Sequence, residues 1–185
     1  MLGESLAAKL GRESRAGDGS AAPGRAGSEP HVAPRTPGPQ VLIAVDTGFV
    51  PALLDAGDAG HARAKAMAGT AKEGWITTWP VLTETCHLVQ RELGSAAAAA
   101  LMLDVADGGL AVWEIPQARQ HDIPALMKRY AVLPMDLADA SLVLLAEHLG
   151  HGRILSTDLR DFGSHRWKGR KPFVNLLDPG AGSVG

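Results

Sequence analysis

Cysteine is almost absent from this chain of 185 residues. Because Cys86 is the only one, no disulfide can form within the chain, and a reducing compartment is the expected environment. No apolar run approaches the roughly 20 residues that cross a bilayer, and the N-terminus lacks the apolar segment of a secretory signal. The formal net charge is only −2, which argues against a polycation that grips nucleic acid through bulk charge. These absences predict a cytoplasmic protein without a membrane segment.

The residues that are present have the composition of a globular protein, since 45% of them are apolar. Residues 1–40 differ from the rest. They are rich in Gly, Ala, Pro, Ser and Arg, and they bury too little surface to offset the entropy lost on ordering. We therefore expect a disordered or loosely docked N-terminal extension over 1–40, a folded domain over 41–178 and a flexible tail over 179–185. The extension is either an interaction tail or, as we favour, dispensable.

After residue 40, apolar strands alternate with helical patterns. This alternation predicts an α/β fold with three layers, in which helices cover both faces of a central parallel sheet. Right-handed crossovers bring the carboxyl ends of the strands to one edge, with the first strand at the centre. The expected strands are 41–46, 75–78, 110–115, 153–158 and 172–177, and the expected helices are 2–10, 49–56, 59–72, 78–93, 95–108, 117–130 and 135–149.

Four carboxylates fall at this predicted edge. Asp46 and Asp158 end strands. Glu84 follows the second strand and shares a helix face with apolar residues three positions before and four after it, so we expect it to point toward the sheet. Asp139 lies in an otherwise apolar helix, where an unpaired buried acid would be costly. Alone, Asp46 and Asp158 can each be explained as a strand-end or cap residue and Glu84 as a partner of a helix dipole, and an N-cap is the better explanation for Asp136.

Together the four acids indicate a metal site. Ionised carboxylates this close would repel one another, and a divalent cation relieves that repulsion. Oxygen ligands suit Mg²⁺ or Mn²⁺, whereas no His and Cys stand at zinc-ligand spacing. Such an ion generates a hydroxide nucleophile and neutralises charge on a phosphate in the transition state. The residues therefore favour metal-dependent phosphodiester hydrolysis, with Asp46, Glu84, Asp139 and Asp158 as ligands and catalytic groups.

Two other functions compete with this one. A phosphotransferase of the haloacid-dehalogenase type would use Asp46 as nucleophile and a second Asp two residues later. Gly48 stands at that position, so the general acid is missing. A module that binds RNA or a protein partner without catalysis is the stronger alternative, and the complete set of four acids argues against it.

Four motifs, taken in order, resemble one known family. They are Val45-Asp46-Thr-Gly-Phe49, Thr83-Glu84-Thr, Leu133-Pro-Met-Asp136-Leu-Ala-Asp139-Ala-Ser141 and Leu155-Ser-Thr-Asp158-Leu-Arg-Asp161-Phe162. Over about residues 42–178 the chain resembles the PIN-domain ribonucleases, in particular the toxins of VapBC-type toxin–antitoxin pairs. The resemblance implies a three-layer α/β/α fold and Mg²⁺ or Mn²⁺ held by the four acids named above.

The resemblance also implies roles around the metal ligands and beyond them. Ser156 corresponds to a position that supports the site through a hydrogen bond, and Asp136 and Asp161 correspond to acids that surround the ligands. The Thr47 hydroxyl follows Asp46 directly and is placed to contact a metal-bound water. The family further implies an endoribonuclease that cleaves single-stranded or structured RNA, forms homodimers and is inhibited by a cognate antitoxin protein.

A basic segment follows Asp158 directly and is therefore expected beside the site. Its cations would hold RNA phosphates, and Trp167 among them would stack on a base. The alternative is a solvated loop between strands. The RNA-binding candidates are Arg160, Arg166, Lys168 and Arg170.

Overall fold

The computed structural model describes residues 41–158 and 161–178. The expected N-terminal extension with its short helix, the C-terminal tail and Arg160 lie outside the described residues. The elements are β1 (Leu42–Val45), α2 (Phe49–Leu54), α3 (His61–Thr70), β2 (Gly74–Thr78), α4 (Trp79–Leu93), α5 (Ser95–Ala106), β3 (Ala111–Trp113), η1 (Gln117–Arg119), α6 (Asp122–Arg129), α7 (Leu137–Leu149), β4 (Arg153–Leu155), α8 (Asp161–Ser164), β5 (Arg166–Trp167), β6 (Lys171–Pro172) and β7 (Val174–Asn175).

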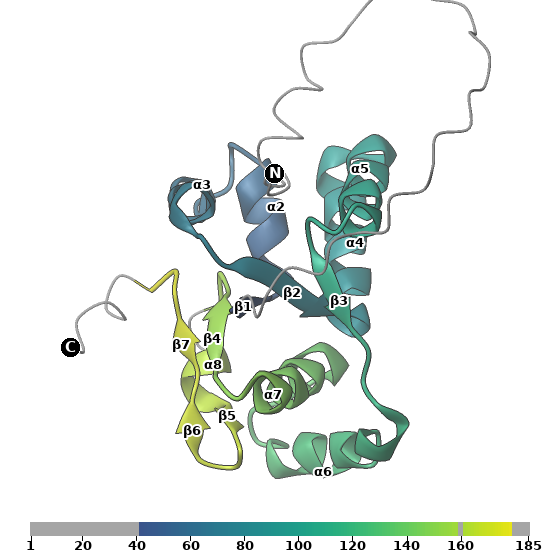
Figure 1. Ribbon diagram of the computed structural model, residues 1–185, viewed down its shortest axis with the longest axis vertical. Helices are drawn as coiled ribbons and strands as arrows, with labels where there is room; N and C mark the ends of the chain where they lie inside the picture. The colour runs from purple at the N-terminus through teal and green to yellow at the C-terminus, as the bar shows by residue number, and fades with distance from the viewer. Residues whose placement is uncertain (1–40, 159–160, 179–185) are drawn as a thin grey trace, which may run out of the picture.

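The five-stranded sheet has the order β3-β2-β1-β4-β7, and every neighbouring pair is parallel. The first strand is therefore the central one, as predicted. Helices α2, α3, α4 and α5 lie on one side of the sheet, and α6 and α7 lie on the other (Figure 1). The predicted three-layer α/β/α fold is confirmed.

Strand alternation divides the core into two halves. Ile43 and Val45 of β1 face α2, α4 and α5, while Ala44 between them faces α7. Buried residues surround α7 on all sides, because the sheet covers one of its faces while α6 and β5 contact it elsewhere. This burial fixes the position of α7, whose N-terminal turn carries two of the candidate acids.

Some elements are shorter than expected. Strand β4 ends at Leu155 and does not reach Asp158, because the backbone N–H of Ser156 donates to the side chain of Asn175 at 3.2 Å. The helix expected over 117–130 is divided into η1 and α6. Because α6 begins at Asp122, Pro124 lies in its first turn, where a missing N–H is tolerated.

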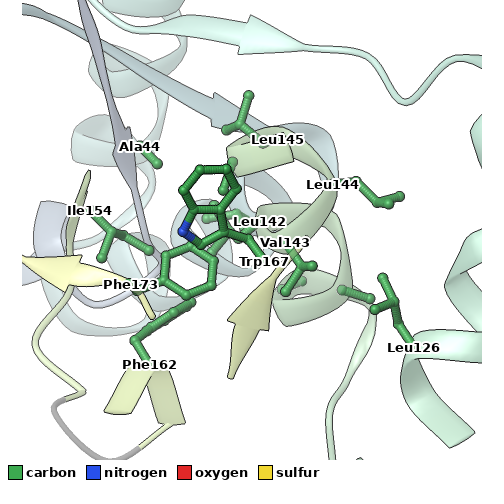
Figure 2. Packing of buried hydrophobic residues seen from close by; sticks show 14 of the residues in the cluster. Ala44, Leu126, Leu142, Val143, Leu144, Leu145, Ile154, Phe162, Trp167 and Phe173 are labelled. Atoms are coloured by element: carbon green, nitrogen blue, oxygen red, sulfur yellow. The ribbon is translucent and has the colours of Figure 1, made fainter. Parts of the chain in front are cut away.

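The sequence did not predict the helix and the hairpin that lie between β4 and β7. Strand β7 runs parallel to β4, with Val174 beside Arg153, so the chain must return from the carboxyl end of β4 to its amino end. Helix α8 and the antiparallel β5–β6 hairpin make this return. Figure 2 shows Trp167 of β5 packed against the side chains of α7 together with Phe162 and Phe173. The hairpin therefore lies toward the amino end of the sheet.

Among the helices that the structure describes, none combines the length and apolar character that crossing a membrane requires.

Candidate active site at the carboxyl edge of the sheet

Asp46 is the most strongly perturbed acid at this edge. It follows β1 directly, and its backbone N–H donates to the Leu155 carbonyl of β4 at 3.0 Å. Burial raises the pKa of Asp46 to about 6, and the nearby charges of Asp158 and Glu84 also raise it. A hydrogen bond from Ser156 acts in the opposite direction. The carboxyl group is thus held where its ionised form is costly and other acids are close.

Ser156 connects Asp46, which follows β1, with Asp158 in the turn after β4. Its side chain is fully buried, and its hydroxyl donates to Asp46 Oδ2 at 2.7 Å. The same oxygen accepts a hydrogen bond from the backbone N–H of Asp158 at 3.0 Å, which folds the chain into a turn after β4. This contact to Asp46 is the kind of support that the resemblance implied for Ser156.

Asn175 is a site residue that the sequence reasoning missed. Its side chain accepts from the Ser156 N–H and donates to the Ser156 carbonyl at 2.8 Å. It thereby fixes the backbone of the residue that holds Asp46. The only signal in the sequence was a polar residue inside the apolar run Phe173–Leu177. The sequence does not indicate which residue Asn175 contacts.

Glu84 lies at the rim of the site, and its predicted direction is wrong. The side chain is exposed, because the buried face of α4 is formed by Val81, Leu82, Thr85 and Val89. Its Oε2 accepts a hydrogen bond from the Thr47 hydroxyl at 3.2 Å, which turns Glu84 toward the residue next to Asp46. Partial burial and the charge of Asp136 raise the pKa of Glu84.

Asp136 and Asp139 form a capping box at the start of α7. The N–H of Asp139 donates to Asp136 Oδ1 at 2.9 Å, and the N–H of Asp136 donates to Asp139 Oδ2 at 3.3 Å. Asp136 is therefore the N-cap, as predicted. A bond of 2.6 Å between the hydroxyls of Ser141 and Thr78 ties this turn to the end of β2. Asp139 is half-buried in the first turn of α7.

The turn after Asp46 has no room for a side chain at position 48, where the residue is Gly48. A side chain at Gly48 would overlap the Thr157 hydroxyl, so this position leaves room for the turn after β4 to approach β1. Asp161 begins α8, beyond the turn that contains Asp158. The two strand-end turns are thus packed directly against each other.

Charge interactions place Asp46 near Asp158 and Glu84, and Glu84 near Asp136. Even so, no group of three or more His, Cys, Asp or Glu residues in the described ranges is arranged to hold a metal ion. Oxygen donors of like charge are the set that Mg²⁺ or Mn²⁺ prefers. The donor chemistry therefore fits these ions.

The described cations of the basic segment, Arg166, Lys168 and Arg170, do not lie beside the acids, so their predicted position is wrong. Lys168 donates its backbone N–H to Glu147 at 2.9 Å, and Glu147 follows Asp139 by about 12 Å along α7. Arg166 and Arg170 flank the same hairpin turn. The reason is the return path to β7 described above, which carries the hairpin to the opposite end of the sheet.

Trp167 cannot stack on a base. Only 5% of it is exposed, its indole N–H donates to the Pro172 carbonyl at 2.9 Å, and the ring lies where a side chain at Gly152 would be. That Arg166, Lys168 and Arg170 contact RNA stays a prediction.

Comparisons with known proteins agree with this architecture. Residues 43–166 match the family model described as the PIN domain. The chain is 26% identical over 125 residues to Ribonuclease VapC26 of Mycobacterium tuberculosis, an alignment that covers 66% of this chain and 90% of that protein. The crystal structure of M. tuberculosis VapC20, described as a sarcin–ricin loop cleaving toxin, superposes with a TM-score of 0.58 and 26% identity, covering 64% of this chain and 92% of that one.

Proposed function

Since the chain belongs to the PIN-domain family, we propose that it is an endoribonuclease that depends on Mg²⁺ or Mn²⁺ and hydrolyses phosphodiester bonds of single-stranded or structured RNA. The observation that carries the proposal is the state of Asp46. A desolvated acid with a pKa of about 6, beside two other acids, is typical of a site that a cation completes. The relative named a ribonuclease supports the choice of RNA, and the second relative is described as a sarcin–ricin loop cleaving toxin.

Asp46, Glu84, Asp139 and Asp158 are the residues that would hold the metal. The bound ion would supply an activated water and neutralise charge on the scissile phosphate. Ser156 orients the Asp46 carboxylate and lowers its pKa, which favours the ionised form that a ligand must have. Thr47 holds Glu84 at the rim, and the Asp136 cap fixes the first turn of α7 around Asp139. We retain Asp161 as a neighbour of the ligands.

The proposal includes a physiological role. Both relatives are VapC proteins and one is described as a toxin, which supports a toxin that arrests growth until a cognate antitoxin binds it. We further propose a homodimer that acts in the cytoplasm. Induced expression should stop growth, and co-expression of a small neighbouring antitoxin gene should restore it. Growth that continues on induction of a well-folded protein would contradict the toxin role.

One observation favours a second candidate, a PIN-like module that binds RNA or a partner without cleaving it. The described acids do not form a group of three that is ready to hold a metal ion. The two candidates make opposite predictions for RNA cleavage, so a single assay separates them.

That assay compares the wild type with Asp46→Asn and the control Glu92→Gln, which changes an exposed acid at the far end of α4. Total RNA is incubated with each protein and Mn²⁺, or with EDTA. Because the metal stabilises transition-state charge by several kcal/mol, Asp46→Asn should lose cleavage by about a thousandfold, while Glu92→Gln should cleave normally. Cleavage that survives both the substitution and the chelator would refute the metal mechanism.

A further inference from the structure

An open groove of about 390 Å³ lies between α6, α7 and the turn of the β5–β6 hairpin, away from the acids of the carboxyl edge. Apolar side chains from α6 and α7, Leu126 and Leu144, form part of its lining. Most of the remaining lining residues are charged, with Arg119, Arg129 and Lys168 among them. A polar, cationic groove of this kind suits an anionic ligand better than an apolar one.

The two acids of the groove are both paired with Arg119. Arg119 donates from Nε to Asp122 Oδ2 and from Nη2 to Glu147 Oε2, both at 2.6 Å. The other oxygen of Glu147 accepts the backbone N–H of Lys168 at 2.9 Å. This network joins η1, α6, α7 and the hairpin into one wall, and both carboxylates are occupied by it.

The remaining cations of the groove have no such partners. Among the residues that the structure describes, neither the Arg129 guanidinium nor the Lys168 ammonium forms an ion pair with a carboxylate. Arg129 lies against the hairpin turn, since a side chain at Gly169 would be 3.7 Å from its Nη1. Lys128, Arg170 and Lys171 are exposed on the same two elements. The net charge here is positive on a chain whose total is −2.

The hairpin turn is built to present these groups. Lys168 has a φ of 46° and Gly169 a φ of 72°, and the N–H of Arg170 donates to the Trp167 carbonyl. These angles match a type I′ turn, in which Asn, Asp or Gly is preferred at the first central position and a lysine is uncommon. The ammonium groups of Lys168 and Lys171 lie 5.5 and 4.8 Å from the centre of the Trp167 ring, so the buried indole keeps both cations at this end of the hairpin.

We propose that this groove, with Arg129 and Lys168 at its walls, binds the phosphate backbone of the RNA substrate at a point remote from the bond that is cleaved. The proposal rests on the proposed function for the identity of the substrate. The groove lies at least about 12 Å from Asp139, measured along α7 to Glu147. Because a stacked strand rises about 3.4 Å per nucleotide, a stacked trinucleotide spans less than this distance, whereas a longer folded RNA reaches both places.

The test uses Arg129→Ala combined with Lys168→Gly, since glycine keeps the turn that the positive φ requires. The control combines Lys65→Ala with Arg91→Ala, which removes the same charge from exposed positions on α3 and α4. Binding of a hairpin RNA of roughly 25 nucleotides is measured in the Asp46→Asn background, so that the RNA stays intact. The affinity of the groove variant should fall by about tenfold or more, and its slope of log Kd against log salt should fall by about 1 to 2. The control variant should stay close to the Asp46→Asn parent in both quantities.

A second measurement compares kcat/KM for the hairpin RNA and for a trinucleotide with an intact active site. The preference for the long RNA should fall by about tenfold in the groove variant, through a higher KM for the long RNA. An equal loss on both substrates would overturn the proposal, because it would indicate damage to the fold or to the active site. Displacement of the RNA by polyglutamate at equal charge concentration would overturn it too, since the groove would then accept any acidic chain.

The binding and kinetic measurements distinguish a failure of the groove proposal from a failure of the proposed function. Weaker binding of the long RNA in the groove variant, but not in the control, supports the groove even if no RNA is cleaved by the wild type. Unchanged binding overturns the groove even if the wild type cleaves both RNAs.

Discussion

The two ends of the parallel sheet differ in how their charges are satisfied. At the carboxyl edge, Asp46, Asp158 and Glu84 lie close to one another, and the pKa of Asp46 rises to about 6. Near the amino end, Asp122 and Glu147 are both bound by Arg119 at 2.6 Å. Acids occur at both ends, so the count of acids does not identify a site. The difference is that burial and the charges of Asp158 and Glu84 raise the pKa of Asp46, whereas Asp122 and Glu147 serve as structural partners of a cation.

Helix α7 joins the two ends. Its first turn carries the capping box of Asp136 and Asp139, and its last turns carry Glu147 and contact the hairpin. Acids near the start of a helix and cations near its end both interact favourably with the helix dipole. Helix α7 thus separates the acidic end, where we propose a metal, from the hairpin end, where we propose phosphate binding.

The largest effect on stability is expected at the basic end, from Trp167→Ala. Trp167 is buried among α7, Phe162 and Phe173, so its removal should lower the free energy of unfolding by about 3 to 5 kcal/mol. The matched control is Trp79→Ala, because Trp79 is 46% exposed and should cost far less. Urea unfolding measures both. If Trp167→Ala weakens RNA binding without loss of stability, the indole contacts RNA and its assignment to the core is wrong.

At the acidic end, Asp46→Asn should stabilise the metal-free protein at neutral pH. The pKa of Asp46 is about 6 in the folded chain against an ordinary 3.8, so the folded state binds the extra proton between these values. Wild-type stability should therefore fall as the pH rises from about 4 to 6, by about 3 kcal/mol from this group, and then level off.

Unfolding by urea in EDTA at pH 4.5 and pH 8 tests this sign. The free energy of unfolding of Asp46→Asn should not show this decrease with pH. The variant should therefore exceed the wild type in stability by more at pH 8 than at pH 4.5. Equal differences at the two pH values would mean that Asp46 has an ordinary pKa and that the contrast between the two ends is not electrostatic.

Ser156→Ala has a smaller expected effect, on the pH profile of cleavage. The serine hydrogen bond lowers the pKa of Asp46, so its loss should move the acidic limb of the profile to higher pH and cost about 2 kcal/mol of stability. Ser141→Ala is the control, since Ser141 is another fully buried serine, bonded to Thr78 and not to an acid. If both variants leave the profile in place, the role of Ser156 is structural alone.

The fold was largely predictable because its signals are local. The apolar run before Asp46 and the alternation of strands and helices determine a parallel sheet with the first strand central. The cap at Asp136 was also readable, since a capping box needs only residues three positions apart.

The remainder depends on contacts between distant parts of the chain. The strands β5 and β6 have two residues each, too short for a periodic pattern, and the parallel pairing of β7 with β4 decides where they lie. Whether Glu84 is buried depends on the exact rotation of α4 against the sheet, which spacing alone does not determine. Asn175 acts on Ser156 across the edge of the sheet, and no local motif joins the two.

The central claim is that the acids of the carboxyl edge bind a divalent cation, and Mn²⁺ binding followed by isothermal titration calorimetry tests it most directly. The wild type and Glu92→Gln should bind Mn²⁺ with the same stoichiometry, and binding should weaken below about pH 6 as Asp46 becomes protonated. Asp46→Asn should lose this binding while remaining folded. Equal Mn²⁺ binding by the wild type and Asp46→Asn, or no binding by either at pH 8, would contradict the account.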